Sequence, residues 1–543
     1  MDSSRNRRGL PDRRTQAMRG GDATALLRRM PDRFSHVVCD WAAIEWSRIA
    51  LTSASGHLSY GDLWNATREA VETLRELGVR AGDRVLLVAE NGLQIVPLLL
   101  AVSELDAWSV PLNARMSARE VQTIRTFSDC RRALYCVGDS SAAAEHAATD
   151  TIDRQVSVLG PVAAGTLNEG ARQEPVYPDK ARQTAVLVFT SGTTGEPKGV
   201  MLSHQALIYM GANMVALRGI TCDDAFYNSS PISHAIGLGT VLMTAFWAGA
   251  SAELVARFTP AHFVAALKAE RITAITGVPT LFARILEYAE EKGISLRSRR
   301  LRIIATAGAP LDLALKARVE EAFGLQMGNS YGMTECNPLA RSAGGVETNE
   351  VGELQPGVEI RIVAEDGRDV GADESGEIWA KGPTCMLGYY RNEAATAAAM
   401  RKGGWLATGD LARMDDQGRL FIVGRSKDLI IRSGFNVYPV EVESVLSLFP
   451  GVASVAVVGR DVPGNEEVVA FVQPLPGQVL DVDALSQWAN ERLAPYKRPS
   501  EIFIKSELPI GPTGKIFKIR LKQLAASNSS AACHTPRSVL PTD

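Results

Sequence analysis

Hydrophobic and polar positions follow one another along the chain with the periods of helices and strands. Apolar residues within 59–79 fall on one helical face, Ser59 stands where an N-cap belongs, and Gly78 marks the end of the helix. The apolar run at 84–89 then predicts a buried strand, and residues 94–105 predict a second helix.

The same strand–turn–helix order returns at 185–215 and at 272–290, which indicates an α/β architecture with largely parallel strands. After Asp410 the elements become shorter. Strands are expected at 419–423, 454–458, 468–473 and 501–504, and helices at 440–448 and 481–493. This change predicts a small α+β domain at the C-terminal end.

Together these elements predict the fold class. It is α/β, with a large N-terminal domain of several subdomains and mostly parallel sheets, joined by a hinge to a small mobile α+β C-terminal domain. The length of 543 residues agrees, because a single core rarely grows beyond about 300 residues. The predicted divisions are a disordered arm (1–20), the N-terminal domain (21–426), the C-terminal domain (427–526) and a disordered tail (527–543).

Composition and charge narrow the classes of partner. A formal net charge of −3 creates no field that would attract nucleic acid or an anionic membrane, and aromatic residues make up only 6% of the chain. No apolar run reaches the roughly 18 residues of a membrane-spanning helix. The arginine-rich N-terminal stretch lacks the apolar segment of a secretory signal. We therefore expect a cytoplasmic protein without a membrane span or a nucleic-acid partner, and a homodimer stays open.

Seven cysteines are scattered through the chain without a CxxC pair. An odd, unpatterned set predicts reduced thiols, not a disulfide framework or a zinc site. The histidines also lack HExxH spacing, so no catalytic zinc is expected. The seven are Cys39, Cys130, Cys136, Cys222, Cys336, Cys385 and Cys533.

The strongest chemical signal is the segment Thr190-Ser-Gly-Thr-Thr-Gly-Glu-Pro-Lys-Gly199, which directly follows the apolar run at 185–189. Its glycines let the backbone approach a ligand, its hydroxyl and N–H groups can surround phosphate oxygens, and Lys198 supplies positive charge. Pro197 stands where a Walker loop needs its second glycine, which disfavours a P-loop NTPase. The alternative, a flexible surface loop, is disfavoured by the preceding buried strand.

In order and spacing, this segment and five later ones resemble the adenylate-forming superfamily, which includes acyl-CoA synthetases, peptide-synthetase adenylation domains and luciferases. The five are Ala307-Gly-Ala-Pro310, Asn329-Ser-Tyr-Gly-Met-Thr-Glu335, Thr408-Gly-Asp410, Gly424-Arg-Ser-Lys-Asp428 and Pro512-Thr-Gly-Lys515. The resemblance spans roughly residues 40–525 and favours the acyl-CoA synthetase, or fatty-acid–CoA ligase, type. It implies an N-terminal domain that binds AMP and the acyl group, and a C-terminal domain that carries the catalytic lysine.

The resemblance also implies roles for single residues. Lys515 would bridge the attacking carboxylate and the α-phosphate, Thr334 would contact that phosphate, and Glu335 would hold Mg²⁺. His234 would lie near the acid's carboxylate, with a paired core histidine as the alternative. The other positions implied in binding ATP or coenzyme A are Thr190, Ser191, Gly192, Thr193, Thr194, Gly195, Lys198, Ala307, Gly308, Ala309, Asn329, Ser330, Tyr331, Gly332, Met333, Asp410, Arg425, Lys427, Ser433 and Gly434.

Elementary chemistry agrees with several of these assignments. Tyr331 offers a flat face to adenine, and the Asn329 amide can read the edge of the base. The Asp410 carboxylate can accept hydrogen bonds from both ribose hydroxyls, and Arg425 can add another contact. Lys515 follows a Pro-Thr-Gly turn, which presents a side chain on a loop instead of burying it.

Two features bear on which molecule accepts the acyl group and on which carboxylic acid is activated. The segment at 430–439 resembles the acyl-CoA synthetase form, in which Gly434 would line the pantetheine tunnel. Coumarate-type ligases carry lysines where this chain has Ile431 and Ser433, which favours fatty- or medium-chain ligases. The expected pocket walls are apolar and include no arginine for a dicarboxylate, so a fatty, medium-chain or aromatic acid fits. These walls are Leu238, Gly332, Met333, Pro338 and Leu339.

The implied reaction has two halves. A carboxylic acid attacks Mg·ATP to give acyl-AMP and pyrophosphate, and the thiol of coenzyme A then displaces AMP after the small domain has turned about Lys427. Two alternatives stay open within the superfamily: an acyl-AMP ligase that loads a carrier protein, and a luciferase-like oxygenating enzyme. A degenerate nucleotide-binding scaffold is disfavoured because the charged positions of every segment are present.

Overall fold

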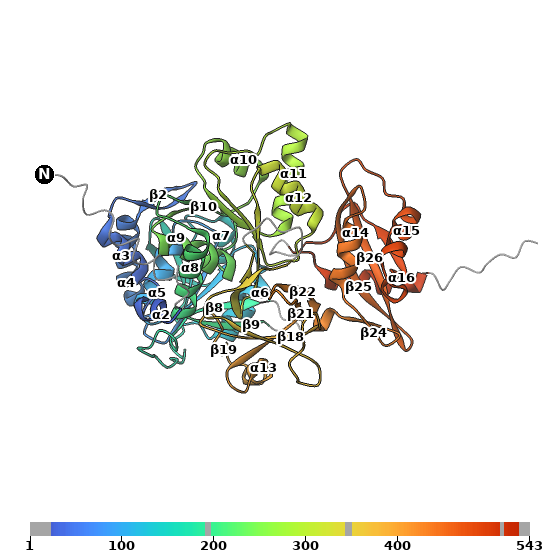
Figure 1. The fold of residues 1–543 in the computed structure, drawn as a ribbon. Helices are drawn as coiled ribbons and strands as arrows, with labels where there is room; N and C mark the ends of the chain where they lie inside the picture. Colours follow the sequence, from blue (N-terminus) through green and yellow to red (C-terminus); the bar gives the residue numbers. More distant parts are fainter. Residues whose placement is uncertain (1–22, 191–196, 343–349, 511–514, 532–543) are drawn as a thin grey trace, which may run out of the picture.

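The computed structural model describes residues 23–190, 197–342, 350–510 and 515–531, including two domains of unequal size. The large N-terminal domain lies at the left of Figure 1 and the small C-terminal domain at the right. The expected N-terminal arm and most of the expected tail lie outside the described residues. The last helix, α16 (Lys518–Ala531), continues past the predicted domain end at residue 526.

The first sheet of the large domain has nine strands in the order β16-β15-β14-β13-β12-β10-β11-β1-β2. Its central strands pair in parallel, whereas both edges are antiparallel. In sheet order the strands are Glu353–Leu354, Cys336–Arg341, Met327–Met333, Ile303–Ala307, Ala274–Gly277, Ala225–Asn228, Ser251–Leu254, Ile49–Ser53 and Gly56–Ser59.

The second sheet has eight strands in the order β19-β9-β8-β4-β3-β5-β7-β6, again parallel at its centre and antiparallel at its edges. In sheet order they are Gly388–Tyr389, Lys198–Ser203, Thr184–Thr190, Trp108–Asn113, Arg84–Ala89, Arg132–Tyr135, Pro161–Gly165 and Ile152–Ser157. The strand–turn–helix prediction for 185–215 needs correction here, because β8 and β9 form an antiparallel pair before the helix begins. The predicted phosphate loop therefore joins two strands.

A third sheet is entirely antiparallel, so the expectation of mostly parallel sheets holds only for the centres of the first two. It contains β17 (Glu359–Val363), β18 (Gly376–Lys381), β21 (Trp405–Met414), β20 (Met400–Arg401) and β22 (Leu420–Arg425).

Helices cover the sheets of the large domain (Figure 1). They are α2 (Ala23–Arg29), α3 (His36–Ile44), α4 (Tyr60–Glu76), α5 (Ile95–Glu104), α6 (Ala118–Ser128), α7 (Ser141–Ala148), α8 (His204–Arg218), α9 (Met243–Ala248), α10 (Pro260–Lys268), α11 (Pro279–Lys292), α12 (Leu313–Phe323) and α13 (Glu393–Ala399). The seven-residue segment η1 (Ile236–Leu242) is a π-helix that packs against α8 and α9. Within the described residues, no helix combines the length and the apolarity needed to cross a membrane.

The local predictions for α4 and its neighbours are confirmed. The Ser59 hydroxyl accepts a hydrogen bond from the Asp62 N–H at 3.0 Å, and the Asp62 carboxylate accepts one from the Ser59 N–H in return. Such a capping box stabilises a helix start by about 1 kcal/mol. The strand at Arg84–Ala89 is buried along its whole length, as its apolar run predicts.

The small domain is a sandwich around one sheet. Its strands are β25 (Val452–Val462), β26 (Asn465–Pro474) and β27 (Glu501–Ile504), and its helices are α14 (Pro439–Ser447), α15 (Val482–Arg492) and α16, with the hairpin β23 (Ile430–Arg432) and β24 (Phe435–Val437) beside them. Alternate residues of β25 face opposite sides: Val457 packs with Leu446 and Leu485, whereas Val458 packs with Leu521. The strands and helices expected after Asp410 are therefore confirmed.

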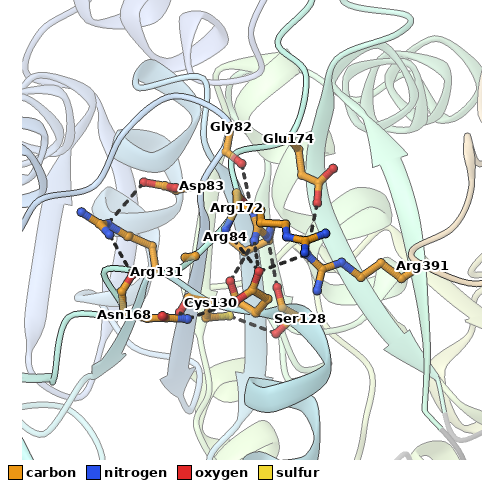
Figure 2. A network of polar contacts seen from close by, with 12 residues as sticks. Gly82, Asp83, Arg84, Ser128, Cys130, Arg131, Asn168, Arg172, Glu174 and Arg391 are labelled. Atoms are coloured by element: carbon orange, nitrogen blue, oxygen red, sulfur yellow. Dashed lines mark hydrogen bonds and ion pairs between the residues drawn. The ribbon is translucent and has the colours of Figure 1, made fainter.

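A buried arginine network stabilises one end of the second sheet. Figure 2 shows Arg84 at its centre, fully removed from solvent. Its guanidinium donates to the backbone oxygens of Ser128 at 3.0 Å, Gly82 at 2.9 Å and Asp129 at 2.8 Å. Arg391, which follows β19, donates to the Asp129 carboxylate at 3.0 Å. The network thus fixes the segment after β19 to the interior of the large domain.

Candidate active site

The first sheet places two predicted segments next to each other. Strands β13 and β14 are parallel neighbours in which Ala307 pairs with Ser330. The carboxyl ends of parallel strands meet at one edge of a sheet, where α/β proteins bind their ligands. Gly308 and Asn329 therefore lie at the same edge, and the Asn329 side chain is 94% buried, its amide 3.4 Å from the Glu350 oxygen.

Asp410 joins the third sheet to this edge. Its carboxylate accepts a hydrogen bond from the Tyr331 hydroxyl at 2.8 Å and pairs with Arg425 at 3.0 Å. Burial, followed by the neighbouring negative charge of Asp410, raises the pKa of Tyr331 well above its ordinary value, so the phenol stays protonated and can donate. Tyr331, Asp410 and Arg425, which are far apart in the sequence, thus form one cluster.

Glu335 lies in the same region, in the turn between β14 and β15. Its carboxylate is buried and accepts a hydrogen bond from the Tyr389 hydroxyl at 2.7 Å. The ammonium of Lys198 lies 5.1 Å from the centre of the Tyr389 ring, within cation–π range. Tyr389 therefore contacts both the residue expected to hold Mg²⁺ and the lysine that ends the predicted phosphate loop.

The sequence did not single out Tyr389, because it lies outside the segments that resemble the superfamily. It is fixed in place by its neighbours: Tyr390 donates to Glu174 at 2.7 Å, and Arg391 joins the Arg84 network of Figure 2. No local signal marks Tyr389, because its role depends on Glu335, which lies 54 positions away in the sequence.

Lys515 reaches this cluster from the small domain. A Cβ atom added to Gly308 would lie 3.6 Å from the Lys515 Cε and 3.8 Å from its Nζ, so the missing side chain leaves space for the lysine. Lys515 is exposed as a whole residue, but burial of its ammonium lowers the pKa, and the charge of Arg425 lowers it further. Asp410 and Glu335 act in the opposite direction, which places the ammonium near both carboxylates.

His234 lies near Lys515, two residues before η1 begins. Burial lowers the pKa of His234 to about 4, and the positive charge of Lys515 contributes. The imidazole is therefore neutral at physiological pH and can serve as a hydrogen-bonding group without adding charge. Ile236, two residues later, is the neighbour that a Cβ on Gly308 would meet at 3.0 Å.

Lys427 extends the positive side of the cluster. Burial lowers the pKa of Lys427, and the charges of Arg425 and Lys198 lower it further, whereas Asp428 and Asp410 raise it. Four cations thus surround the two carboxylates of Asp410 and Glu335. They are Lys198, Arg425, Lys427 and Lys515.

Two predicted residues of the small domain, Ser433 and Gly434, do not join the cluster. Ser191, Gly192, Thr193, Thr194 and Gly195 lie outside the described residues. Ser433 and Gly434 form the turn between β23 and β24, both with positive φ, and a Cβ on Gly434 would meet nothing within 4 Å. In Figure 1, β24 lies at the lower edge of the small domain.

The remaining positions lie on the edge itself: Thr190 ends β8, Ala307 ends β13, Ala309 follows Gly308, and Ser330, Gly332 and Met333 belong to β14. Thr334 is half-buried in the turn before Glu335. Among the described residues no group of three or more His, Cys, Asp or Glu side chains could hold a metal alone. Mg²⁺ needs no such group, because it commonly takes one or two carboxylates and completes its shell with phosphate oxygens and water.

Comparison with known proteins agrees with this geometry. Residues 39–390 match the AMP-binding enzyme family and residues 441–515 match the AMP-binding enzyme C-terminal domain. A feruloyl-CoA synthase of Amycolatopsis sp is 33% identical over 471 residues, which cover 85% of this chain and 92% of the relative. An indoleacetate–CoA ligase of Aromatoleum aromaticum is 32% identical over 498 residues, which cover 89% and 96%.

A solved structure is also similar to this chain over most of its length. O-succinylbenzoate coenzyme A synthetase from Bacillus subtilis, in complex with ATP and magnesium ion, has a TM-score of 0.76 and 28% identity, over 90% of this chain and 99% of that one. Fold and cluster together define a two-domain adenylate-forming enzyme. The chain belongs to the AMP-binding enzyme family, and within it to the acyl-CoA synthetase type.

Proposed function

We propose that this acid–CoA ligase activates an aromatic carboxylic acid with Mg·ATP and transfers the acyl group to coenzyme A. The observation that carries the proposal is the position of Lys515, which the small domain inserts between Gly308 and the carboxylates of Asp410 and Glu335. A lysine there can neutralise charge on an acid and on the phosphate that it attacks.

The chain's own residues suit the nucleotide. Lys198, Lys427 and Lys515 supply positive charge for the phosphates, and Asp410 can accept from the ribose hydroxyls with its remaining lone pairs. Glu335 would hold Mg²⁺, which when bound neutralises phosphate charge. Tyr389 then orients the Glu335 carboxylate by the hydrogen bond described above.

In the first half-reaction a carboxylate oxygen of the acid bonds to the α-phosphorus of ATP, and pyrophosphate leaves. Lys515 stabilises the charge of this transition state, and neutral His234 hydrogen-bonds to the acid. In the second, the sulfur of coenzyme A bonds to the acyl carbon, and AMP leaves. For that step we propose that the small domain turns about Lys427 and brings Gly434 to the intermediate.

Two observations support an aromatic acid. The relatives' names contain feruloyl, indoleacetate and succinylbenzoate, each of which has an aromatic ring. In this chain the expected pocket walls, among them Leu238, Pro338 and Leu339, are apolar, which suits the faces of a ring. The preference for fatty- or medium-chain acids that Ile431 and Ser433 suggest rests on the hairpin β23–β24, which is not part of the cluster.

A matched pair of acids tests the proposal. We expect acid-dependent pyrophosphate release with 3-phenylpropanoate to exceed that with 3-cyclohexylpropanoate, which has the same chain length and no aromatic ring. Ferulate, indoleacetate and octanoate extend the panel, and thioester formation on adding coenzyme A completes the assay. Equal or higher kcat/KM with the saturated acids would reject the aromatic preference, and transfer of the acyl group only to a carrier protein, with release of AMP, would reject coenzyme A as acceptor.

A further inference from the structure

Two cysteines that are distant in the sequence meet beside Glu335. The sulfur atoms of Cys336 and Cys385 lie 2.7 Å apart, although 49 positions separate the two residues. Their backbones form an isolated antiparallel bridge, and the Met386 N–H, one residue further on, donates to the backbone carbonyl oxygen of Glu335 at 2.7 Å. Both thiols are free, as the sequence predicts, but the two are neighbours in space although they are scattered in the sequence.

The geometry of the pair suits a disulfide. Apolar heavy atoms in contact lie about 3.5–4.0 Å apart, so a sulfur–sulfur distance of 2.7 Å lies between contact and a bond of about 2.05 Å. Directly opposed residues of antiparallel strands have Cα atoms about 4.5–5.5 Å apart, within the range that a disulfide spans. Closing the bond therefore needs little movement of the backbone.

The two thiols differ in access to solvent. Cys336 is fully buried, and the hydroxyl of Thr384 lies 3.4 Å from its sulfur, whereas Cys385 is partly exposed. A small oxidant therefore reaches Cys385 first. We propose that Cys336 and Cys385 are a modification site, a dithiol that a hydroperoxide converts to a reversible disulfide next to the Glu335 carboxylate.

The chemistry balances with the peroxide as the sole oxidant. The Cys385 sulfur attacks one peroxide oxygen, the O–O bond breaks, and one water leaves to give a sulfenic acid. The Cys336 sulfur then attacks the oxidised sulfur, the S–O bond breaks, and a second water leaves. Two thiols and one hydrogen peroxide thus give one disulfide and two waters, and a reducing dithiol reverses the bond.

The function of the pair follows from its place in the fold. A lone sulfenic acid proceeds to sulfinic acid, which is polar, charged and not restored by thiols. Beside Cys336, such a group would place a new negative charge next to Glu335. The buried thiol of Cys336 resolves the sulfenic acid before this happens, so the pair protects the carboxylate side of the cluster from irreversible damage.

The test uses the full-length protein and hydrogen peroxide, with peptide masses as the readout, so it does not depend on turnover. After a short exposure to hydrogen peroxide, the free thiols are alkylated. We then expect two peptides joined through Cys336 and Cys385, with a combined mass two hydrogens below that of the two reduced peptides. Dithiothreitol should return both peptides to the reduced mass.

Serine variants sharpen the test. In Cys336→Ser, we expect Cys385 to gain two or three oxygens that dithiothreitol does not remove. In Cys385→Ser, buried Cys336 should stay reduced. Cys222 is the matched control, since it is also partly exposed but its sulfur contacts the Asp223 carboxylate at 3.9 Å. Cys222→Ser should leave the Cys336–Cys385 crosslink unchanged.

Two results would overturn the proposal. In the first, Cys385 of the wild-type protein is oxidised to the sulfinic acid and no peptide pair linked through Cys336 and Cys385 forms. In the second, Cys385 is irreversibly oxidised to the same extent in the wild-type protein and in Cys336→Ser. If either serine variant fails to fold, the first result still decides, because it is read from the peptide masses of the wild-type protein alone.

Discussion

The two sides of the candidate site are held in different ways. On the large-domain side, Glu335, Tyr331 and Asp410 are buried, and each has a hydrogen-bond partner at 2.7–2.8 Å. On the small-domain side, Lys515 reaches the cluster from an exposed position at the start of its described segment. One side is a rigid surface that can orient a nucleotide, whereas the other is a single charge that a domain movement can bring or remove.

The largest expected effect comes from removing the mobile charge. Lys515→Ala should lower acid-dependent pyrophosphate release by roughly 10²–10³-fold, because one preorganised transition-state charge is lost. Thioester formation from supplied acyl-AMP should be nearly unchanged, because that half-reaction takes place after Lys515 has left. Lys522→Ala, an exposed lysine on α16, is the control. Equal losses in both half-reactions would contradict the contrast between the two sides.

On the rigid side, Glu335→Gln removes the carboxylate expected to hold Mg²⁺. The half-saturating Mg²⁺ concentration should rise by roughly 10-fold to 100-fold, while the KM of the acid changes little. Titration of Mg²⁺ at fixed ATP measures the change. An increase confined to the acid's KM would place Glu335 in the acid pocket instead.

Tyr389→Phe tests how the rigid side is organised. The substitution keeps the ring under Lys198 but removes the hydroxyl that donates to Glu335. We expect the half-saturating Mg²⁺ concentration to rise by roughly 10-fold, with kcat at saturating Mg²⁺ nearly restored. Tyr390→Phe is the matched control, because its hydroxyl donates to Glu174 in the network of Figure 2 and should affect Tm without changing the Mg²⁺ requirement.

The smallest effect is on pH dependence. Burial and Arg425 lower the pKa of Lys515 below its ordinary value of 10.5, and the charged form is the active one. Activity is therefore complete at pH values below the lowered pKa and is lost as pH rises through it. The alkaline limb of kcat/KM for pyrophosphate release should lie below pH 10.5. Lys515→Arg keeps its charge at that pH, so its residual activity should show no such limb.

Much of the fold could be predicted from the sequence, because local signals carry it. The capping box at Ser59, the buried run at Arg84–Ala89 and the α+β elements after Asp410 need only neighbouring residues to be recognised. The antiparallel pairing of β8 and β9 was missed because a short strand and a helix start share apolar residues. The period of the apolar positions therefore cannot distinguish a short strand from the start of a helix.

The site could be predicted only in part, because some of its contacts join residues that are distant in the sequence. Lys515, Glu335 and Asp410 belong to segments that resemble a superfamily, whereas Tyr389 and the Cys336–Cys385 pair do not. Their contacts join residues 54 and 49 positions apart, and no local pattern encodes such pairings. The domain boundary at Lys427 and the roles of Ser433 and Gly434 stay predictions.

The π-helix η1 has a consequence for how this enzyme could acquire a new acid specificity. A π-helix holds one more residue in its turn than an α-helix, so deleting a single residue from Ile236–Leu242 would restore the α-helical repeat. The residues on both flanks would keep their orientation, because a π turn accommodates its extra residue without turning the rest of the helix. A one-codon deletion could thus reshape the segment that follows His234 in a single evolutionary step, without any substitution around Glu335 or Asp410.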